Sequence, residues 1–244
     1  MKTISEKDLI NLLLETGLLK KVLRTGWILK GVENAESVAD HSWRVAILAL
    51  ILAPQLKVDQ LKLVKMALIH DLGEALIGDI KWERGKRVIG SQEEKHKDER
   101  KAIKKMFADN PSFKEYVDLW GEFTEQKTRE AKIMKELDKL EMVIQALEYE
   151  QENYPAEWFN EFWENAEKYL ADQGLESYFH YLQDKKKTAK DKKLKKIPLS
   201  DFCFCQKGSG NGKNDLKKSF DGYHRDYGND LKNDYSDYHD HATG

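Results

Sequence analysis

The amino-acid sequence predicts an all-α protein, a helical bundle followed by a C-terminal tail. From residue 5 to about residue 184, apolar residues recur at spacings of three and four, as in Leu9, Leu12 and Leu13, which is the period of an amphipathic helix. No stretch alternates apolar and polar residues between turn dipeptides, the pattern that would indicate a strand. The prolines fall where helices are expected to start or stop, at positions 54, 111, 155 and 198.

The periodicity and the prolines together predict the individual helices in chain order. Helices are expected near residues 5–22, 36–53, 58–78, 91–108, 113–124, 128–151, 156–171 and 174–184. The second ends before Pro54, and the seventh begins after Pro155, because proline interrupts a helix. The connection at 79–90, DIKWERGKRVIG, is the longest irregular stretch in the body, and we expect an active-site loop there.

Composition changes at Lys185 and divides the chain into a helical domain, residues 1–184, and a tail, residues 185–244. The tail is rich first in Lys and then in Gly, Asp and Tyr, so it buries too little apolar surface to order itself fully. Its lysine block leaves RNA, anionic lipid or an import receptor open as partners, beside a solvated tail without a partner. The spacing of Cys203 and Cys205 fits no standard zinc finger.

The sequence favours a cytoplasmic protein that does not enter a membrane. Its two cysteines are one residue apart, a poor geometry for a structural disulfide and typical of a reducing compartment. The N-terminal MKTISEKDLI lacks the apolar core of a signal peptide, and the apolar run VAILALILA is too short to span a bilayer. The acidic body argues against a nucleic-acid groove, which leaves only the lysine block for such contacts.

The stretch ALIHDLGEALIGD places His70, Asp71, Glu74 and Asp79 in an otherwise apolar segment. On one continuous helix, His70 and Glu74 share the side that faces the core. Asp71 and Glu74 side by side in apolar surroundings would repel each other unless a cation or a cationic side chain neutralises them. The segment therefore predicts a bound cation or a basic partner.

Two other predicted helices supply matching groups. His41 in ESVADHSWRVAILAL is bracketed by apolar residues at helical spacing, and Asp138 in EAKIMKELDKLEMVIQALEYE adjoins an apolar stripe. Taken singly, they read as a core histidine and a solvated carboxylate. Together with His70 and Asp71 they form a mixed nitrogen and oxygen set that suits a first-row divalent metal. Such a set leaves positions open for water or substrate.

The order His, His-Asp, Asp resembles the HD superfamily of metal-dependent phosphohydrolases. The blocks LLKKVLRTGW, ESVADHSWRVAILAL, ALIHDLGEALIGDI, EEKH and EAKIMKELDKLEMVIQALEYE are similar to successive blocks of its 5′-deoxynucleotidase branch, over roughly residues 5–180. The resemblance implies an HD-domain helical bundle that removes phosphate from deoxynucleoside 5′-monophosphates. It also implies a homodimer, to which the amphipathic WFNEFWENAEKYL would contribute.

The resemblance also implies a role for each matching residue. The ligands of one divalent metal ion (Co, Mn, Zn, Fe or Mg, which the sequence leaves open) would be His41, His70, Asp71 and Asp138. Glu74 and Asp79 match acidic groups beside the metal, where one would handle a proton and the other would orient water or the 3′-hydroxyl of the substrate. Arg24 matches a residue that contacts phosphate, and Trp27 one that contacts the sugar.

The chain departs from the family pattern at two places. Bacterial members have the Arg and Trp adjacent, whereas two residues separate Arg24 from Trp27 here, so core packing is an equal alternative for Trp27. Family members often follow GDI with a proline and a short acidic loop, and this chain has KWERGKRVIGSQEEKH instead, so substrate preference stays open. Lys95 and His96 match a family block without an assigned chemical role.

Two alternatives to a 5′-deoxynucleotidase remain. Another HD phosphohydrolase would act on a cyclic phosphate, a nucleoside triphosphate or a dinucleotide, although bulkier anions call for a more basic pocket than the acidic body indicates. A non-catalytic scaffold would use the lysine-rich tail to bind nucleic acid or membrane. A scaffold, however, has no need of His and Asp in an apolar setting.

Overall fold

The structure, a computed structural model, describes residues 4–79, 92–107, 113–170 and 174–191. All of them belong to one compact unit, Met1–Leu194. The regular secondary structure of these residues is helical, with one isolated bridge between Leu23 and Ser37, which confirms the predicted all-α class. The expected loop after Asp79 and the tail from residue 192, with Cys203 and Cys205, lie outside the described residues.

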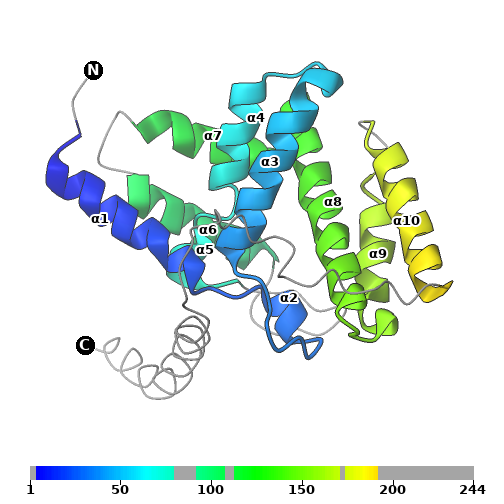
Figure 1. Cartoon of the computed structure of the whole chain (residues 1–244). Helices are drawn as coiled ribbons and strands as arrows, with labels where there is room; N and C mark the ends of the chain where they lie inside the picture. The colour runs from blue at the N-terminus through cyan, green and yellow to red at the C-terminus, as the bar shows by residue number, and fades with distance from the viewer. Residues whose placement is uncertain (1–3, 80–91, 108–112, 171–173, 192–244) are drawn as a thin grey trace, which may run out of the picture. The chain divides into compact units, whose positions relative to one another are not determined.

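Figure 1 shows the helices in chain order. Their bounds are α1 Glu6–Gly17, α2 Thr25–Ile28, α3 Val38–Leu56, α4 Gln60–Ile69, α5 Glu74–Ile77, α6 Gln92–Phe107, α7 Lys114–Glu125, α8 Arg129–Gln151, α9 Asn160–Glu167 and α10 Glu176–Asp191. The described residues also form two short 3₁₀ helices: η1 (Leu18–Lys20) follows the C-terminal end of α1, and η3 (Ala156–Phe159) directly precedes α9.

Helix α8 is the centre of the core. It packs against α3, α4 and α7, and it also contacts α9 and α10 (Figure 1). Its predicted apolar stripe is buried at Ile133, Leu137 and Leu140. The same helix also buries the carboxylates of Asp138 and Glu141. A buried carboxylate is unfavourable unless a cation or hydrogen-bond donor pairs with it, so these positions point to a polar cluster inside the bundle.

The start of α3 is fixed by a capping box. The Ser37 hydroxyl accepts the Asp40 N–H (3.2 Å), and the Asp40 carboxylate accepts the Ser37 N–H (2.9 Å). Each side chain thereby satisfies a backbone donor that the helix leaves free. His41, the next residue, is consequently held at a defined height on α3.

The prediction of one continuous helix over 58–78 is wrong. Helix α4 ends at Ile69, residues 70–73 form a turn, and α5 begins at Glu74. Glycine disfavours helix, and a Cβ at Gly73 would lie 3.2 Å from the Glu99 carbonyl oxygen of α6, so this turn needs the close approach that glycine permits. His70 and Glu74 therefore do not share one continuous helix, as the prediction assumes.

Other boundaries also differ from the prediction: α3 continues through Pro54 to Leu56, so the prediction that this helix ends before Pro54 is wrong. The first helix gives way to η1 at Leu18, and α10 continues to Asp191 rather than ending at residue 184. The amphipathic face of α9, proposed for a dimer interface, packs inside the protomer through Phe162, Trp163 and Ala166. In the part of the chain that the structure describes, the helices are too short or too polar to cross a membrane.

Candidate metal centre

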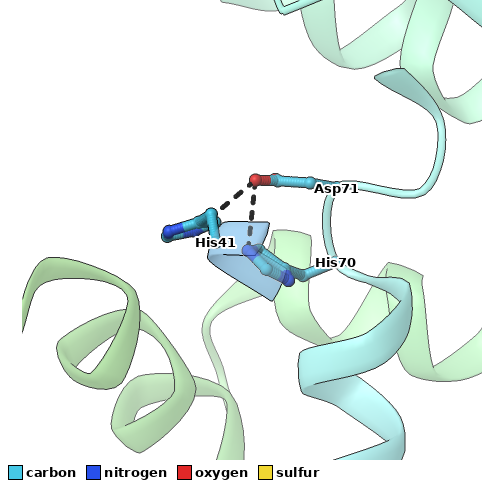
Figure 2. Close-up of side chains that lie close together, drawn as sticks. All are labelled: His41, His70 and Asp71. Carbon is cyan, nitrogen blue, oxygen red and sulfur yellow. Dashed lines mark ion pairs between the residues drawn. The ribbon is translucent and has the colours of Figure 1, made fainter. Parts of the chain in front are cut away.

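His41, His70 and Asp71 converge at one point from different segments. His41 comes from the first turn of α3, and the other two from the turn after α4 (Figure 2). One potential ligand atom of each lies within 4.8 Å of the other two. Asp71 Oδ2 lies 3.2 Å from His70 Nε2 and 3.8 Å from His41 Nε2. Both histidines are buried, whereas the side chain of Asp71 is 17% exposed, so the group is closed to solvent on the side of the histidines and open to it at Asp71.

The two imidazole rings are oriented so that both Nε2 atoms face this point. His70 Nδ1 donates to the Ala67 carbonyl oxygen (2.8 Å), and His41 Nδ1 donates to the Glu141 carboxylate. Neither Nε2 has a partner in hydrogen-bond geometry among the described residues. Buried polar atoms without partners are unfavourable, and imidazole nitrogens beside a carboxylate suit a divalent cation. The residues present therefore fit a metal ion.

Charges around His41 favour its protonated form. Burial and the charge of Arg24 lower its pKa, but Glu141 and Asp138 raise it more, to about 10. The positive charge of the imidazolium then offsets part of the negative charge of these carboxylates, as a bound cation would. A metal ion that binds Nε2 must displace this proton, which makes metal affinity dependent on pH.

Asp138 of α8 lies beside His41 but outside the tight group of three. Its Oδ1 is 3.3 Å from His41 Nε2. Its Oδ2 accepts a hydrogen bond from Lys135 (2.9 Å) and lies 3.4 Å from Lys139 Nζ. Although burial opposes ionisation, the two lysines hold the pKa of Asp138 well below its usual range. Asp138 is thus a charged carboxylate next to a ligand, and its role as fourth ligand stays a prediction.

Arg24 contacts the site through an ion pair with Asp71. Its Nη1 donates to Asp71 Oδ2 at 3.3 Å, and its side chain is mostly buried. Burial raises the pKa of Asp71, but His70 and Arg24 lower it further, to below the ordinary range of a carboxyl. The predicted phosphate-binding residue is therefore in direct contact with one of the predicted metal ligands.

Glu74, at the start of α5, is buried close to the same cluster. Lys95 of α6 donates to its Oε1 at 3.1 Å, and Oε2 has no hydrogen-bond partner among the described residues. Burial raises the pKa of Glu74 well above its ordinary value, the charges of Asp71 and Asp79 act in the same direction, and Lys95 opposes them. Burial and the neighbouring carboxylates therefore favour the protonated form of Glu74.

Asp79 holds the segment that carries Arg24. The Thr25 N–H donates to Asp79 Oδ2 (2.7 Å), and the Thr25 hydroxyl donates to the Asp79 carbonyl oxygen. Gly78, at a φ of +78°, allows the chain to turn here, since other residues rarely adopt that conformation. Asp79 thus fixes the backbone next to Arg24 through contacts that the sequence did not indicate.

Trp27 lies in the core rather than at the metal centre. Its side chain is 1% exposed, and its ring packs against those of Tyr149, Phe159 and Phe162. Its Nε1 donates to Glu36 Oε1 at 2.9 Å. Core packing accounts for these contacts, and a contact between Trp27 and the sugar stays a prediction.

Sequence reasoning missed Glu141 and Arg44. Glu141 lies one helical turn after Asp138 and Arg44 one turn after His41, so both point toward the same side of their helices as a predicted ligand. Glu141 is fully buried, and its carboxylate contacts both His41 and Arg44. The signal in the sequence is that each of them follows a predicted ligand by three residues, which places the two side chains on the same face of a helix.

The chain is similar to known proteins over most of this helical body. A model of the HD domain family matches residues 16–178. A 5′-deoxynucleotidase of Xenopus laevis is 41% identical over 148 residues, which cover 59% of this chain and 71% of the relative.

Solved structures agree with that match. A conserved hypothetical protein from Pyrococcus furiosus has a TM-score of 0.59 and 37% identity, and the match covers 72% of this chain and 99% of that one. A predicted metal-dependent phosphohydrolase from Magnetospirillum magnetotacticum has a TM-score of 0.54 and 26% identity, over 73% and 91% of the two chains. Since the family model spans well over half of its length, the chain belongs to the HD domain family.

Proposed function

We propose that this protein is a metal-dependent 5′-deoxynucleotidase, which hydrolyses the phosphate ester of deoxynucleoside 5′-monophosphates. The observation that carries the proposal is the pair of buried Nε2 atoms of His41 and His70, which have no hydrogen-bond partners in the described part of the chain and face Asp71 beside Arg24. The name of the Xenopus laevis relative, a 5′-deoxynucleotidase, supports the choice of substrate class.

His41, His70, Asp71 and Asp138 would hold one divalent cation. When bound, such an ion lowers the pKa of a water molecule and offsets the negative charge of the phosphoryl oxygens. The histidines contribute neutral nitrogen donors and the two aspartates contribute charge. That mixture is accepted by several first-row metals, so the identity of the ion is a matter for measurement.

Arg24 would bind the phosphate. Its Nη1 contacts Asp71 at 3.3 Å, which keeps the guanidinium beside the metal ligands. A guanidinium offers a planar pair of donors that matches two phosphate oxygens. Asp71 thus orients Arg24 beside the predicted metal ligands, where the guanidinium would bind the phosphate.

Glu74 would donate the proton that the leaving 5′-oxygen needs. A general acid must be protonated at working pH and lie close to the reacting group. The raised pKa of Glu74 favours the first condition, and the contact of its Oε1 with Lys95 restricts the carboxyl to one orientation. Asp79 would orient the 3′-hydroxyl or a water molecule, and its carboxylate is itself held by the Thr25 N–H.

The decisive test is phosphate release by metal-free and metal-loaded protein. We expect deoxynucleoside monophosphates to be hydrolysed faster than ribonucleoside monophosphates after addition of Co²⁺, Mn²⁺, Zn²⁺, Fe²⁺ or Mg²⁺. His70→Ala should lose bound metal and activity together, because it removes a ligand. His180→Ala, which changes an exposed histidine of α10, is the matched control. Activity that survives His70→Ala would refute the enzyme proposal, and equal turnover of both sugars would refute the deoxyribose preference.

A homodimer is part of the proposal. Helix α3 exposes Trp43 (64%), Ile47 (36%), Leu50 (48%) and Ile51 (57%), which recur at the spacing of one helical face. Monomers rarely expose large contiguous apolar patches, and a second copy of the chain would cover this one.

Light scattering tests the dimer directly. We expect twice the mass of one chain for the wild type and the mass of a monomer for Trp43→Glu, because a charge cannot be buried in that contact without a partner. Tyr181→Glu, at an exposed site on α10, should leave the mass unchanged. A monomeric wild type would remove the dimer from the proposal and leave the enzyme in place. The cytoplasmic location stays a prediction.

A further inference from the structure

A buried ionic cluster lies behind His41, on the side of the ring that faces away from Asp71. Arg44 follows His41 by one turn of α3, and Glu141 follows Asp138 by one turn of α8. Arg44 Nε and Nη2 approach Glu141 Oε1 at 2.8 and 2.7 Å. Arg44 thereby joins α3 to α8 directly behind two of the predicted metal ligands.

Glu141 links this cluster to His41. Its Oε2 accepts the His41 Nδ1–H while its Oε1 is held by Arg44. The side chains of His41 and Glu141 are 0% exposed, so water cannot replace either partner. Because both carboxylate oxygens are occupied, the position of the carboxylate is fixed, and with it the rotation of the imidazole. A proton held on Nδ1 makes Nε2 the atom available to a cation.

We propose that Glu141 and Arg44 are positioning residues that set the affinity of this protein for its divalent cation through His41. The inference rests on the proposed function, since it assumes that a cation binds at His41 Nε2. Outer partners of metal-binding histidines fix the ring orientation and raise ligand basicity, and their loss typically weakens metal binding about 10- to 100-fold. Glu141 acts on the imidazole, and Arg44 acts on Glu141.

The alternative is that the cluster only joins two helices. The chain offers a direct comparison, because Arg44 has a second carboxylate partner on α8. Arg44 Nη1 donates to both oxygens of Glu148 at 2.8 and 2.7 Å, but Glu148 is 46% exposed in its side chain. Of these two glutamates, Glu141 is the one that touches His41. Glu148→Gln therefore removes an ion pair of Arg44 without changing a contact of His41. Glu141→Gln removes an ion pair of Arg44 and also changes the contact with His41.

The experiment is a titration of the metal-free full-length protein with Mn²⁺ or Co²⁺, followed by calorimetry. We expect Glu141→Gln to weaken cation binding about 10- to 100-fold and Glu148→Gln to bind like the wild type. Excess cation should restore the kcat of Glu141→Gln with the KM for nucleotide unchanged, since Glu141 faces the ligand and not the substrate. Rescue by excess cation is an outcome that a purely structural role does not give.

Wild-type affinity in Glu141→Gln would overturn the inference, and so would an equal loss in both Gln variants. If Glu141→Gln does not fold, as judged by circular dichroism, Arg44→Lys replaces it. This variant keeps the charge but not the two-pronged contact, and it should also bind cations more weakly; unchanged affinity would overturn the inference. A wild type that binds no cation would instead refute the proposed metal-dependent function, before any variant is compared.

Discussion

The helix-borne half of the site and the turn-borne half are held in different ways. His41 and Asp138 lie on α3 and α8, inside the core, and their partners come from the same two helices. Asp71, Glu74 and Asp79 lie in or beside short turns and are held by side-chain contacts with Arg24, Lys95 and Thr25. From this difference we expect a division of work: the helix-borne groups would serve the cation alone, whereas the turns would supply the ligands His70 and Asp71 together with Glu74 and Asp79, which would meet the substrate.

Glu74→Gln gives the largest expected effect within the turn-borne half. The amide cannot donate an acidic proton, so kcat should fall about 100- to 10,000-fold, while cation affinity stays close to that of the wild type. In the wild type, kcat should decline as pH rises through the raised pKa of Glu74, because the proton donor is lost, and the variant should lack this decline. Steady-state kinetics from about pH 5 to about pH 9 measures the fall in kcat and its dependence on pH. A large loss of cation affinity in Glu74→Gln would break the division between the halves.

Arg24→Lys tests phosphate recognition. Lysine keeps the charge but offers no planar pair of donors, and hydrogen bonds to charged groups contribute about 1.5–3 kcal/mol. We expect kcat/KM to fall roughly 10- to 100-fold, mainly through a higher KM and weaker inhibition by inorganic phosphate. Arg129→Lys, at an exposed position on α8, serves as the control. An unchanged KM for nucleotide would argue that Arg24 serves only Asp71.

Thr25→Val is the smallest of the three expected effects and the sharpest test of how the turns are held. It removes the hydroxyl donor to the Asp79 carbonyl oxygen and keeps the N–H that binds the carboxylate. One hydrogen bond contributes about 1 kcal/mol, so we expect kcat/KM to fall about 5-fold and Thr25→Ser to restore it. Failure of Thr25→Ser to recover activity would mean that the methyl group, not the hydroxyl, matters here.

The same division explains what could be predicted from the sequence. His41 and Asp138 could be assigned because their helices repeat apolar residues with a clear period, and α3 and α8 formed close to the expected bounds. Glu74 is a predicted site residue, but the sequence pattern places it on a continuous helix, because the close approach at Gly73 is made by Glu99 of α6, which is distant in sequence.

The residues that support the ligands were harder to find. Glu141 reads as an ordinary helix carboxylate until α3 brings Arg44 and His41 against it. Thr25 gives no local signal, because its partner Asp79 lies far along the chain. For Trp27 the sequence leaves sugar contact and core packing as equal alternatives. The rings that pack against it in the structure show the core packing.

The end of α4 at Ile69, just before the paired His70 and Asp71, has an electrostatic consequence. The peptide dipoles of a helix sum to roughly half a negative elementary charge at its C-terminus, where a nearby cation gains about 0.3–1 kcal/mol. Here that end adjoins two predicted ligands, so the backbone itself would attract a cation bound there. Unlike the carboxylates and imidazoles, these carbonyl groups do not titrate, and their share of the attraction is the same at every pH at which the protein is folded.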